Sequence, residues 1–332
     1  MLQEIKILKT IEYKSGDRVA VELPRVHPFS KLQLRLKGAV NVTGAIGAGA
    51  VVANSPATLI KGVDFEVVGG SRSQTIKSLS GVDILKMAEF LFGKQEMINN
   101  MVDAVAAYDF FGSFDLNFKM PDLKDLATDG NGRVYDPSLV TLFDPTQFDP
   151  VRIVITWGTQ ADLWLGGVQA NFAITNANIE VVSLDLPELS GLNNKFSFNR
   201  EQYKETVFSG ADSDLRIDLP KGNRIRAIYV CGIDDGVYSN SLINKVKVIV
   251  NENISKVDVG FNQLRNEAQK KLKLDFANMP NGVAPIYFDE GRDLQGLLDL
   301  SRVDSVRLVA DVNAPANSNG KIRLIVQEYT NA

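Results

Sequence analysis

The sequence predicts an all-β protein made of two tandem antiparallel β-sandwiches, each with an accessory helix. Three observations lead to this prediction: the chain repeats itself in collinear blocks, the blocks alternate apolar and polar residues, and a helical pattern follows the second block of each copy. Alternation with period two is typical of strands that bury one face, as sandwich strands do. Two domains are also the usual organisation of a chain of 332 residues.

Three pairs of segments define the repeat. Residues 16–38 correspond to 212–232, with Leu23 and Pro24 aligned with Leu219 and Pro220 at an offset of 196 residues; 59–67 align with 242–250 at 183, and 142–155 with 297–310 at 155. A weaker pair, 179–182 and 322–325, ends each copy. Because the offset falls along the chain, copy one carries extra residues between the shared blocks, which is how loops lengthen on a fixed scaffold. We therefore expect a first domain with longer loops at 1–188, a linker at 189–200 and a second domain at 201–332.

The strands and helices follow from local patterns. Pro24 and Pro220 are expected to end the first strand of each copy, because proline cannot donate to a sheet ladder. A capping box at Ser80 and Asp83 predicts one helix. The spacing of Phe261, Leu264, Ala268 and Leu272 predicts the second. A further helical pattern, Met97, Met101, Val105 and Tyr108, has no counterpart in copy two, and residues 38–60 read as a Gly/Ala loop rather than a membrane span.

Composition excludes several classes of chemistry. The single cysteine, Cys231, rules out an intrachain disulfide and a cysteine-based zinc site, and it lies in an apolar strand pattern. The single histidine, His27, lies before Pro28 and reads as a turn residue rather than a catalytic base. The net charge is −4 and no long basic run is present, so we expect no direct nucleic-acid binding. No signal-peptide pattern is visible, and we expect synthesis in the cytoplasm.

No assembled catalytic, cofactor or metal site is predicted, and we expect the protein not to be an enzyme. Asp129, Asn131 and Arg133 depart from a calcium-loop pattern. Carboxylates that could serve glycoside hydrolysis are scattered, and sequence places no two of them together. They are Asp144, Asp149, Asp234, Asp235, Asp289 and Glu290. Asp149–Pro150 and Asp304–Ser305 each precede a predicted central strand and are interpreted as turns that fix where it starts.

The tandem sandwiches, the helix after each L-I-x-x-V-x-φ-x-V strand at 59–67 and 242–250, and the longer loops of one copy resemble the double jelly-roll major capsid proteins of the adenovirus hexon lineage. The size of the chain resembles the compact members from tailless, lipid-containing icosahedral bacteriophages, such as those that infect Flavobacterium. The resemblance implies two eight-stranded jelly-roll β-sandwiches, each with an accessory helix. It also implies a structural role in the virion.

The resemblance further implies a homotrimer, because three chains with two similar wedges each make a pseudo-hexameric capsomer that can tile an icosahedral shell. Neighbouring capsomers, minor capsid or vertex proteins and an internal lipid membrane are the partners it implies. Leu2, Ile5 and Leu8 could form a short amphipathic turn near that membrane, although an ordinary edge strand or a frayed terminus is favoured for this segment. The alternative function is a tandem β-sandwich carbohydrate-binding or adhesin protein.

Overall fold

The computed structural model describes most of the chain, and every structural statement below concerns the described residues. These are 3–44, 55–69, 72–92, 98, 105–119, 127–128, 134–135, 142–163, 171–189, 199–272, 279–288, 296–316 and 318–329. The chain divides into two compact units. Unit 1 comprises Met1–Ala88, Lys94–Pro121 and Ser138–Lys195, and unit 2 comprises Glu89–Gly93, Asp122–Pro137 and Phe196–Ala332.

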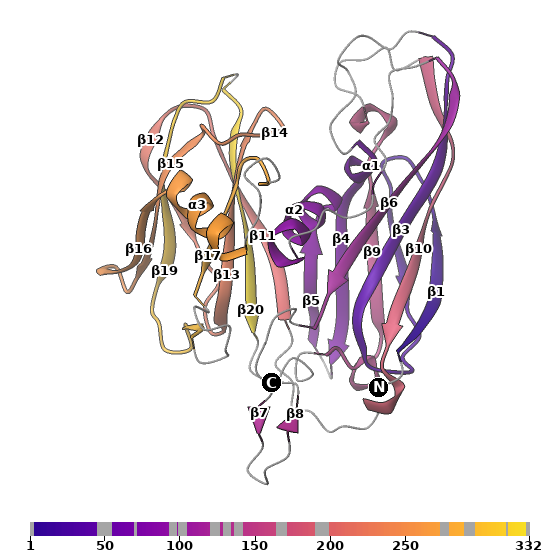
Figure 1. Cartoon of the computed structure of the whole chain (residues 1–332), viewed down its shortest axis with the longest axis horizontal. Helices are drawn as coiled ribbons and strands as arrows, with labels where there is room; N and C mark the ends of the chain where they lie inside the picture. Colours follow the sequence, from indigo (N-terminus) through magenta and orange to yellow (C-terminus); the bar gives the residue numbers. More distant parts are fainter. Residues whose placement is uncertain are drawn as a thin grey trace. The chain divides into compact units, whose positions relative to one another are not determined.

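Unit 1 is a sandwich of two antiparallel four-stranded sheets (Figure 1). One sheet has the order β1-β10-β3-β6, with bounds Glu4–Glu12, Phe172–Asp185, Phe29–Val42 and Ala107–Asn117. The other has the order β2-β9-β4-β5, with bounds Arg18–Glu22, Val151–Trp157, Ile60–Gly69 and Arg72–Leu79. Helix α1 (Ser55–Thr58) precedes β4 and helix α2 (Gly81–Phe92) follows β5. Short 3-10 helices occupy Pro145–Gln147, Gln160–Asp162 and Pro187–Leu189.

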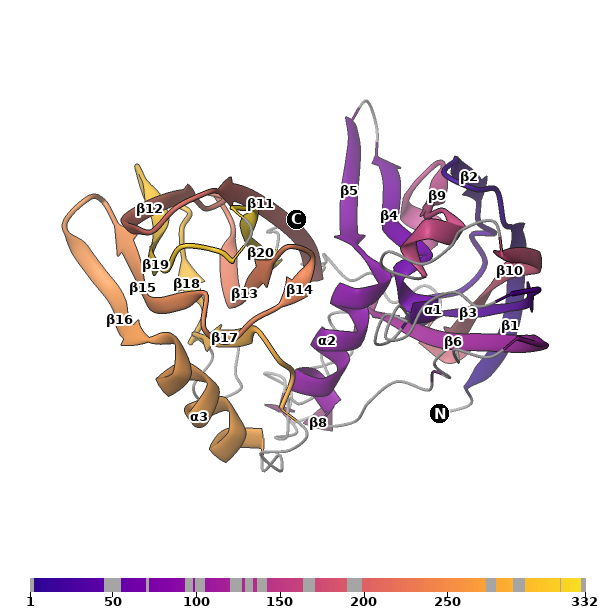
Figure 2. The same ribbon diagram turned by 90° about the horizontal axis from the view of Figure 1, so that it is seen from above.

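Unit 2 repeats this arrangement, and Figure 2 shows its two sheets facing each other. One sheet contains β11 (Asn199–Phe208), β20 (Gly320–Tyr329) and β13 (Arg224–Asp234). Three short strands also pair with β13: β14 (Val237–Tyr238), β17 (Val283–Tyr287) and β18 (Leu298–Asp299). The other has the order β12-β19-β15-β16, with bounds Asp212–Asp218, Val306–Val312, Ile243–Val250 and Ile254–Gly260. Helix α3 (Phe261–Leu272) follows β16, and β7 (Ala127–Thr128) pairs with β8 (Val134–Tyr135).

The two units share their strand register as well as their strand order. Aligned residues pair with aligned partners: Val19 with Ile155 and Leu215 with Ala310; Val63 with Ile155 and Val246 with Ala310; Leu34 with Val181 and Val230 with Leu324. An irregularity in the ladder recurs as well, between Ile60 and Gly62 in β4 and between Ile243 and Lys245 in β15. The fold class predicted from the repeat is therefore confirmed, down to single pairs of residues.

The two helices also begin where the sequence predicts. In α2 the hydroxyl of Ser80 accepts a hydrogen bond from the backbone N–H of Asp83 (3.1 Å), and the Asp83 carboxylate accepts one from the backbone N–H of Ser80 (3.0 Å). This reciprocal pair is the predicted capping box. Helix α3 spans the predicted Phe261–Leu272 and buries Phe261, Leu264 and Ala268.

Three local predictions need correction or lie outside the described residues. Tyr108 belongs to strand β6, not to a helix, because residues 107–117 pair along β3. Strand β3 continues through Gly38 to Val42, so the predicted Gly/Ala loop starts later than expected. Met97, Met101, most of the 189–200 linker and the 129–133 segment lie outside the described residues.

The cores of the two units differ in composition. Unit 1 packs the rings of Phe29, Phe65, Phe118 and Phe143 at centroid distances of 5.0–6.3 Å. The core of unit 2 is mainly Ile, Leu and Val, with Phe208 and Phe261 among its buried members. Each unit therefore has its own apolar core between its two sheets, which is what allows each to be treated as a domain.

Candidate functional site

The carboxylates considered for catalysis hold turns in place. Asp144 caps the 3-10 helix at Pro145–Gln147 by accepting hydrogen bonds from the backbone N–H (3.0 Å) and hydroxyl (2.7 Å) of Thr146. Asp234 accepts a hydrogen bond from the backbone N–H of Ala316 (3.2 Å), and Asp235 accepts one from the side chain of Asn319 (3.2 Å). Such contacts are typical of Asp in turns.

Most of the remaining candidates are not among the residues that the structure describes. Asp289, Glu290, Asp129, Asn131 and Arg133 lie outside the described residues. Among the residues that the structure does describe, no group of three or more His, Cys, Asp or Glu side chains could hold a metal ion. Cys231 is buried in β13 and belongs to no disulfide.

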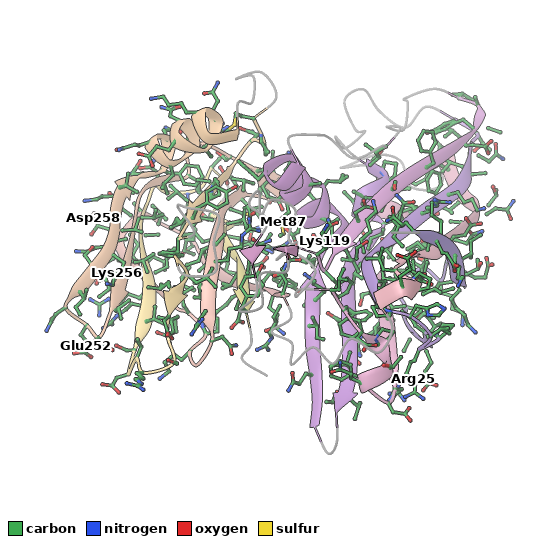
Figure 3. All side chains as sticks on the ribbon, turned by 60° about the horizontal axis from the view of Figure 1, so that its bottom comes forward. Arg25, Met87, Lys119, Glu252, Lys256 and Asp258 are labelled. Atoms are coloured by element: carbon green, nitrogen blue, oxygen red, sulfur yellow. The ribbon has the colours of Figure 1, made fainter. Side chains whose placement is uncertain are left out.

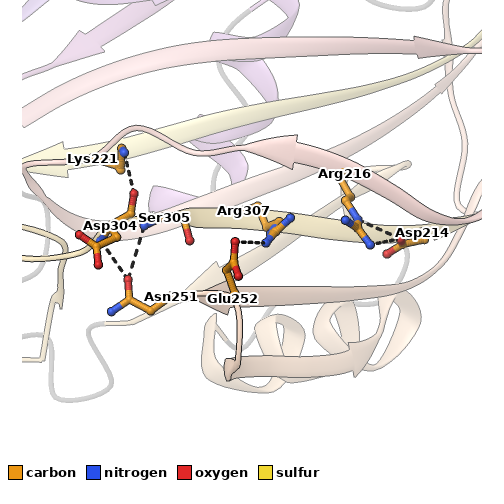
Figure 4. Close-up of polar contacts among 8 residues, drawn as sticks. All are labelled: Asp214, Arg216, Lys221, Asn251, Glu252, Asp304, Ser305 and Arg307. Atoms are coloured by element: carbon orange, nitrogen blue, oxygen red, sulfur yellow. Dashed lines mark hydrogen bonds and ion pairs between the residues drawn. The ribbon is translucent and has the colours of Figure 1, made fainter.

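A polar turn precedes the central strand β19 of unit 2 (Figure 4). The side-chain oxygen of Asn251 accepts hydrogen bonds from the backbone N–H groups of Asp304 (2.9 Å) and Ser305 (3.4 Å). The backbone N–H of Asn251 donates in turn to the carbonyl of Ser305 (2.9 Å). Lys221 adds a hydrogen bond to the carbonyl of Asp304 (2.7 Å). These contacts fix the start of β19, as predicted for this turn.

Unit 1 has the same turn before β9, held by different side chains. The backbone N–H of Val68, which aligns with Asn251, donates to the carbonyl of Pro150 (3.1 Å). Arg25 donates to the carbonyl of Phe148 (2.6 Å) and lies 3.2 Å from the carboxylate of Asp149. The basic residue after the proline and the turn before the central strand thus recur together. Their role in both copies is to position a strand.

Exposed strands form the clearest candidate surfaces for assembly. Strands β1 and β16 each pair on one side only within their own unit. Figure 3 shows Lys256 and Asp258 projecting from β16 and Glu252 from the turn before it. Asp258 forms an ion pair with Lys245 (2.6 Å), whose hydrogen bond lowers the pKa of the Asp258 carboxyl. Charged side chains of this kind discourage uncontrolled pairing at a sheet edge.

Strand β1 is less protected than β16, because it exposes apolar side chains. Ile5 is 65% exposed and Ile7 is 61% exposed, and both occupy the same face because they are two positions apart in the strand. Val26, in the segment between β2 and β3, is 58% exposed. Large apolar side chains grouped on a surface mark places where proteins contact a partner or a membrane.

A cavity of about 330 Å³ lies beside this strand. It is lined by Lys6, Ile7, Leu8, Pro24, Val26, His27, Phe29 and Asp185. Lys6 pairs with Glu4 (2.5 Å) and lies 3.8 Å from Asp185; the hydrogen bond with Glu4 raises the pKa of Lys6 and lowers that of Glu4. The site therefore combines apolar side chains with balanced charges.

The predicted amphipathic turn at Leu2, Ile5 and Leu8 is wrong as local structure. Ile5 and Leu8 belong to the edge strand β1, which was the favoured alternative, and Leu2 lies outside the described residues. Sequence reasoning overlooked Ile7 and Val26. Ile7 could have been found from the period-two spacing of Ile5 and Ile7, whereas Val26 comes from a separate segment that only the fold brings near.

Helices of the described chain are too short to cross a bilayer. The longest, α2 and α3, have 12 residues each, whereas a span needs about 20. No described helix meets the length and hydropathy that a membrane span requires.

Comparison with known proteins shows which solved structures share this fold. No protein-family model and no curated protein sequence matches the chain. Solved structures do match along its whole length. A chain of the Sulfolobus turreted icosahedral virus structure superposes with a TM-score of 0.73 at 14% identity, covering 99% of this chain and 91% of that one. The major capsid protein P2 of bacteriophage PM2 gives 0.59 at 14% identity, covering 99% and 97%.

A third match, from the PBCV-1 virus capsid, has a TM-score of 0.63 at 12% identity and covers 99% of this chain and 93% of that one. The chain has the double jelly-roll fold. The matches cover both jelly rolls at once, so they extend beyond a single sandwich. The low identity means that the double jelly roll is shared through its core pattern rather than through particular side chains.

Proposed function

We propose that this chain is the major capsid protein of an icosahedral virus and acts as a structural, non-enzymatic subunit of the virion shell. The observation that carries this proposal is the double jelly-roll fold, matched over 99% or more of the chain in proteins of viral capsids. The two sandwiches, equal in register, give a physical reason for the duplication.

The proposed capsomer is a homotrimer. Three chains with two similar jelly rolls each present six similar wedges around a threefold axis, which approximates a hexagonal tile. Tiles of that shape can pack with neighbouring capsomers into a closed shell, with minor capsid or vertex proteins completing it. The exposed edge strands β1 and β16 are the surfaces that we expect to contact other copies.

Light scattering coupled to size exclusion tests this proposal directly. The expected mass is about three times 36.4 kDa, and electron microscopy of the purified protein or its source particle should show pseudo-hexagonal capsomers. A protein that stays monomeric under all mild conditions would contradict the proposal. It would favour the alternative of a tandem β-sandwich adhesin or carbohydrate-binding protein.

We further propose that the β1 end of unit 1 faces an internal membrane. Ile5, Ile7 and Val26 supply exposed apolar surface, and Leu2 and Leu8 are the other candidates of this segment. The double variant Ile5→Ser/Ile7→Ser should reduce flotation of the protein with anionic vesicles. The matched variant Ile254→Ser, at an exposed isoleucine of β16, should not. Equal flotation of both variants would contradict a membrane contact at β1.

We propose a first jelly roll at 1–188, a linker at 189–200 and a second jelly roll at 201–332, which limited proteolysis should cut between the two. A particular likeness to the capsid proteins of phages that infect Flavobacterium also stays a prediction.

A further inference from the structure

Unit 2 contains a polar cavity of about 430 Å³ that the assembly of a shell does not explain. It is lined by Asn240, Asn262, Arg265, Asn266, Gln269 and Met279. Four of these residues lie on α3 at spacings of three and four, which places them on one face of the helix. Volumes of this size are common for small-ligand sites. None of the described residues that line the cavity is acidic.

Arg265 is the charged group of this cavity. It is partly buried, and its guanidinium donates a hydrogen bond to the backbone carbonyl of Pro280 (3.1 Å). Its Nε is buried and has no hydrogen-bond partner, and no acidic group within the described ranges pairs with it. Burial lowers the pKa of Arg265, and no neighbouring charge is among the causes of that shift. A partly desolvated cation of this kind gains most from an anionic ligand.

The amides of the cavity supply hydrogen-bonding groups of both kinds. Asn240 is held in place because its side-chain oxygen accepts a hydrogen bond from the backbone N–H of Gly282 (2.7 Å), which leaves its NH₂ group as a donor. In the described part of the chain, the side chains of Asn262, Asn266 and Gln269 take part in no hydrogen bond with protein groups. Amides paired with an apolar Met279 suit a ligand that carries hydroxyl groups on a ring with apolar C–H faces.

The corresponding helix of unit 1 lacks this face. Helix α2 has Val82, Leu85 and Lys86 where α3 has Asn262, Arg265 and Asn266, and Leu85 is buried. Both helices follow the same ladder and have the same length. The polar cavity is therefore not a by-product of the fold, because the other copy of the fold does without it.

We propose that the cavity of Asn240, Asn262, Arg265, Asn266, Gln269 and Met279 binds a carboxylated saccharide, with Arg265 holding the carboxylate and the amides holding ring hydroxyls. A planar guanidinium can form two parallel hydrogen bonds with a carboxylate. The site is formed by unit 2 alone and does not rest on the proposed shell function.

Ligand-observed saturation-transfer NMR on the full-length protein tests this site. The probes are D-galacturonate and N-acetylneuraminate, with D-galactose as the neutral control and inorganic phosphate as the competing simple anion. At least one acidic sugar should bind more tightly than galactose, and phosphate should not displace it at equal concentration. Failure of both acidic sugars to bind, or displacement by equimolar phosphate, would overturn the proposal.

Variants assign the binding to the cavity. Arg265→Gln should weaken binding of the acidic sugar by about tenfold or more, since a hydrogen-bonded charge is lost. Asn262→Ala/Gln269→Ala, which leaves the partly buried arginine in place, should weaken it several-fold. Lys256→Gln removes one positive charge from strand β16, outside the cavity lining, and should leave binding unchanged. An effect of Lys256→Gln equal to that of Arg265→Gln would contradict the proposal.

The readout separates this site from the proposed capsid role. The oligomeric mass of each variant is measured in parallel and should equal that of the unchanged protein. Loss of sugar binding with the mass unaltered assigns the binding to the cavity. A protein that assembles but binds no acidic sugar would overturn the site alone.

Discussion

Units 1 and 2 have the same strand pairing, but different side chains fill their cores. Phe29 bridges Phe143 in unit 1, and the aligned Ile225 pairs with Leu298 in unit 2. Phe65 faces this pair in unit 1, where unit 2 has Val248. The backbone pairing is unchanged although one core uses rings and the other uses branched aliphatic chains. Strand register is thus set by the alternation of apolar and polar residues and by backbone hydrogen bonds. The volumes of individual core side chains can differ between the units, provided that neighbouring side chains change size together.

The largest expected difference between the units is in the cost of emptying the core. Phe65→Ala should destabilise unit 1 by about 3–5 kcal/mol, because Phe65 is fully buried among three other rings. Val248→Ala at the aligned position should cost about 2 kcal/mol, because a smaller side chain is removed. Denaturant unfolding of both variants measures the two losses. Equal losses of unfolding free energy would mean that the aromatic cluster of unit 1 stabilises its core no more than the aligned aliphatic side chains of unit 2 stabilise theirs.

A second comparison concerns two glycines at the same ladder position. Gly282 has φ +67° and its Cβ would lie 2.5 Å from the backbone nitrogen of Ser239. Gly112 has no positive φ, and its Cβ would meet the ring edge of Phe114 at 2.8 Å. Gly282→Ala should therefore cost about 2–4 kcal/mol and Gly112→Ala about 1–2 kcal/mol. Thermal unfolding of the two variants checks the order, and the reverse order would refute the strain assigned to Gly282.

The turn before the central strand offers a third, smaller contrast. Asn251→Ala removes the side-chain acceptor of two backbone N–H groups and places alanine at φ +50°. The expected loss is about 1–2 kcal/mol. Val68→Ala, at the aligned position in unit 1, should cost less than about 1 kcal/mol, since its turn is held by backbone bonds and Arg25. Urea midpoints of the two variants give the difference; indistinguishable midpoints would contradict it.

The smallest predicted effect depends on pH. Burial raises the pKa of Glu205, but the hydrogen bonds and charges of Arg323 and Lys321 lower it by more than burial raises it. Their nitrogens lie 2.7 Å and 3.2 Å from the Glu205 carboxylate, and the pKa in the folded protein is below 4.5. Ionised Glu205 then stabilises the fold at neutral pH, and this contribution is lost as the pH falls below about 4.5. The free energy of unfolding of Glu205→Gln should be about 1 kcal/mol lower at neutral pH and converge with the unchanged protein in acid.

Glu180 provides the control for that measurement. It lies on β10 at the position aligned with Arg323, and Lys37 is the one cation among the described residues that it pairs with. Glu180→Gln should lower the free energy of unfolding at neutral pH less than Glu205→Gln does, because one cation faces it instead of two. A larger effect at Glu180 would show that the Arg323–Glu205–Lys321 cluster is not the stronger of the two.

The sequence predicted the parts of the fold that depend on local pattern. The strands that follow Gly16 and Gly210 alternate strictly, and the helix that starts after Ser80 carries its own cap. The helical interpretation of Tyr108 failed because tertiary pairing with β3 outweighed a spacing that fits a helix. The amphipathic turn at Ile5 and Leu8 failed for the same reason, since β10 pairs with this segment as a strand.

The candidate sites were less accessible to sequence reasoning. The polar cavity joins Asn240, the 262–269 face of α3 and Met279, and these segments are separated along the chain by a strand pair and a helix. No single segment carries a ligand-binding motif, so the local sequence pattern does not predict the cavity. The exclusions rest on composition, because one cysteine and one histidine cannot supply the chemistry that needs several.

The sequence by itself determined that the chain contains two copies of one β pattern, because apolar alternation and the aligned blocks are written in residue order. Tertiary structure decided the rest: which aligned residues pair, which core is filled by rings, which edge strands are exposed and where Arg265 meets four amides. The physical reason is that pairing and burial are cooperative properties of distant segments. A local pattern specifies which face of a strand is apolar, but only the packed partner specifies what that face touches.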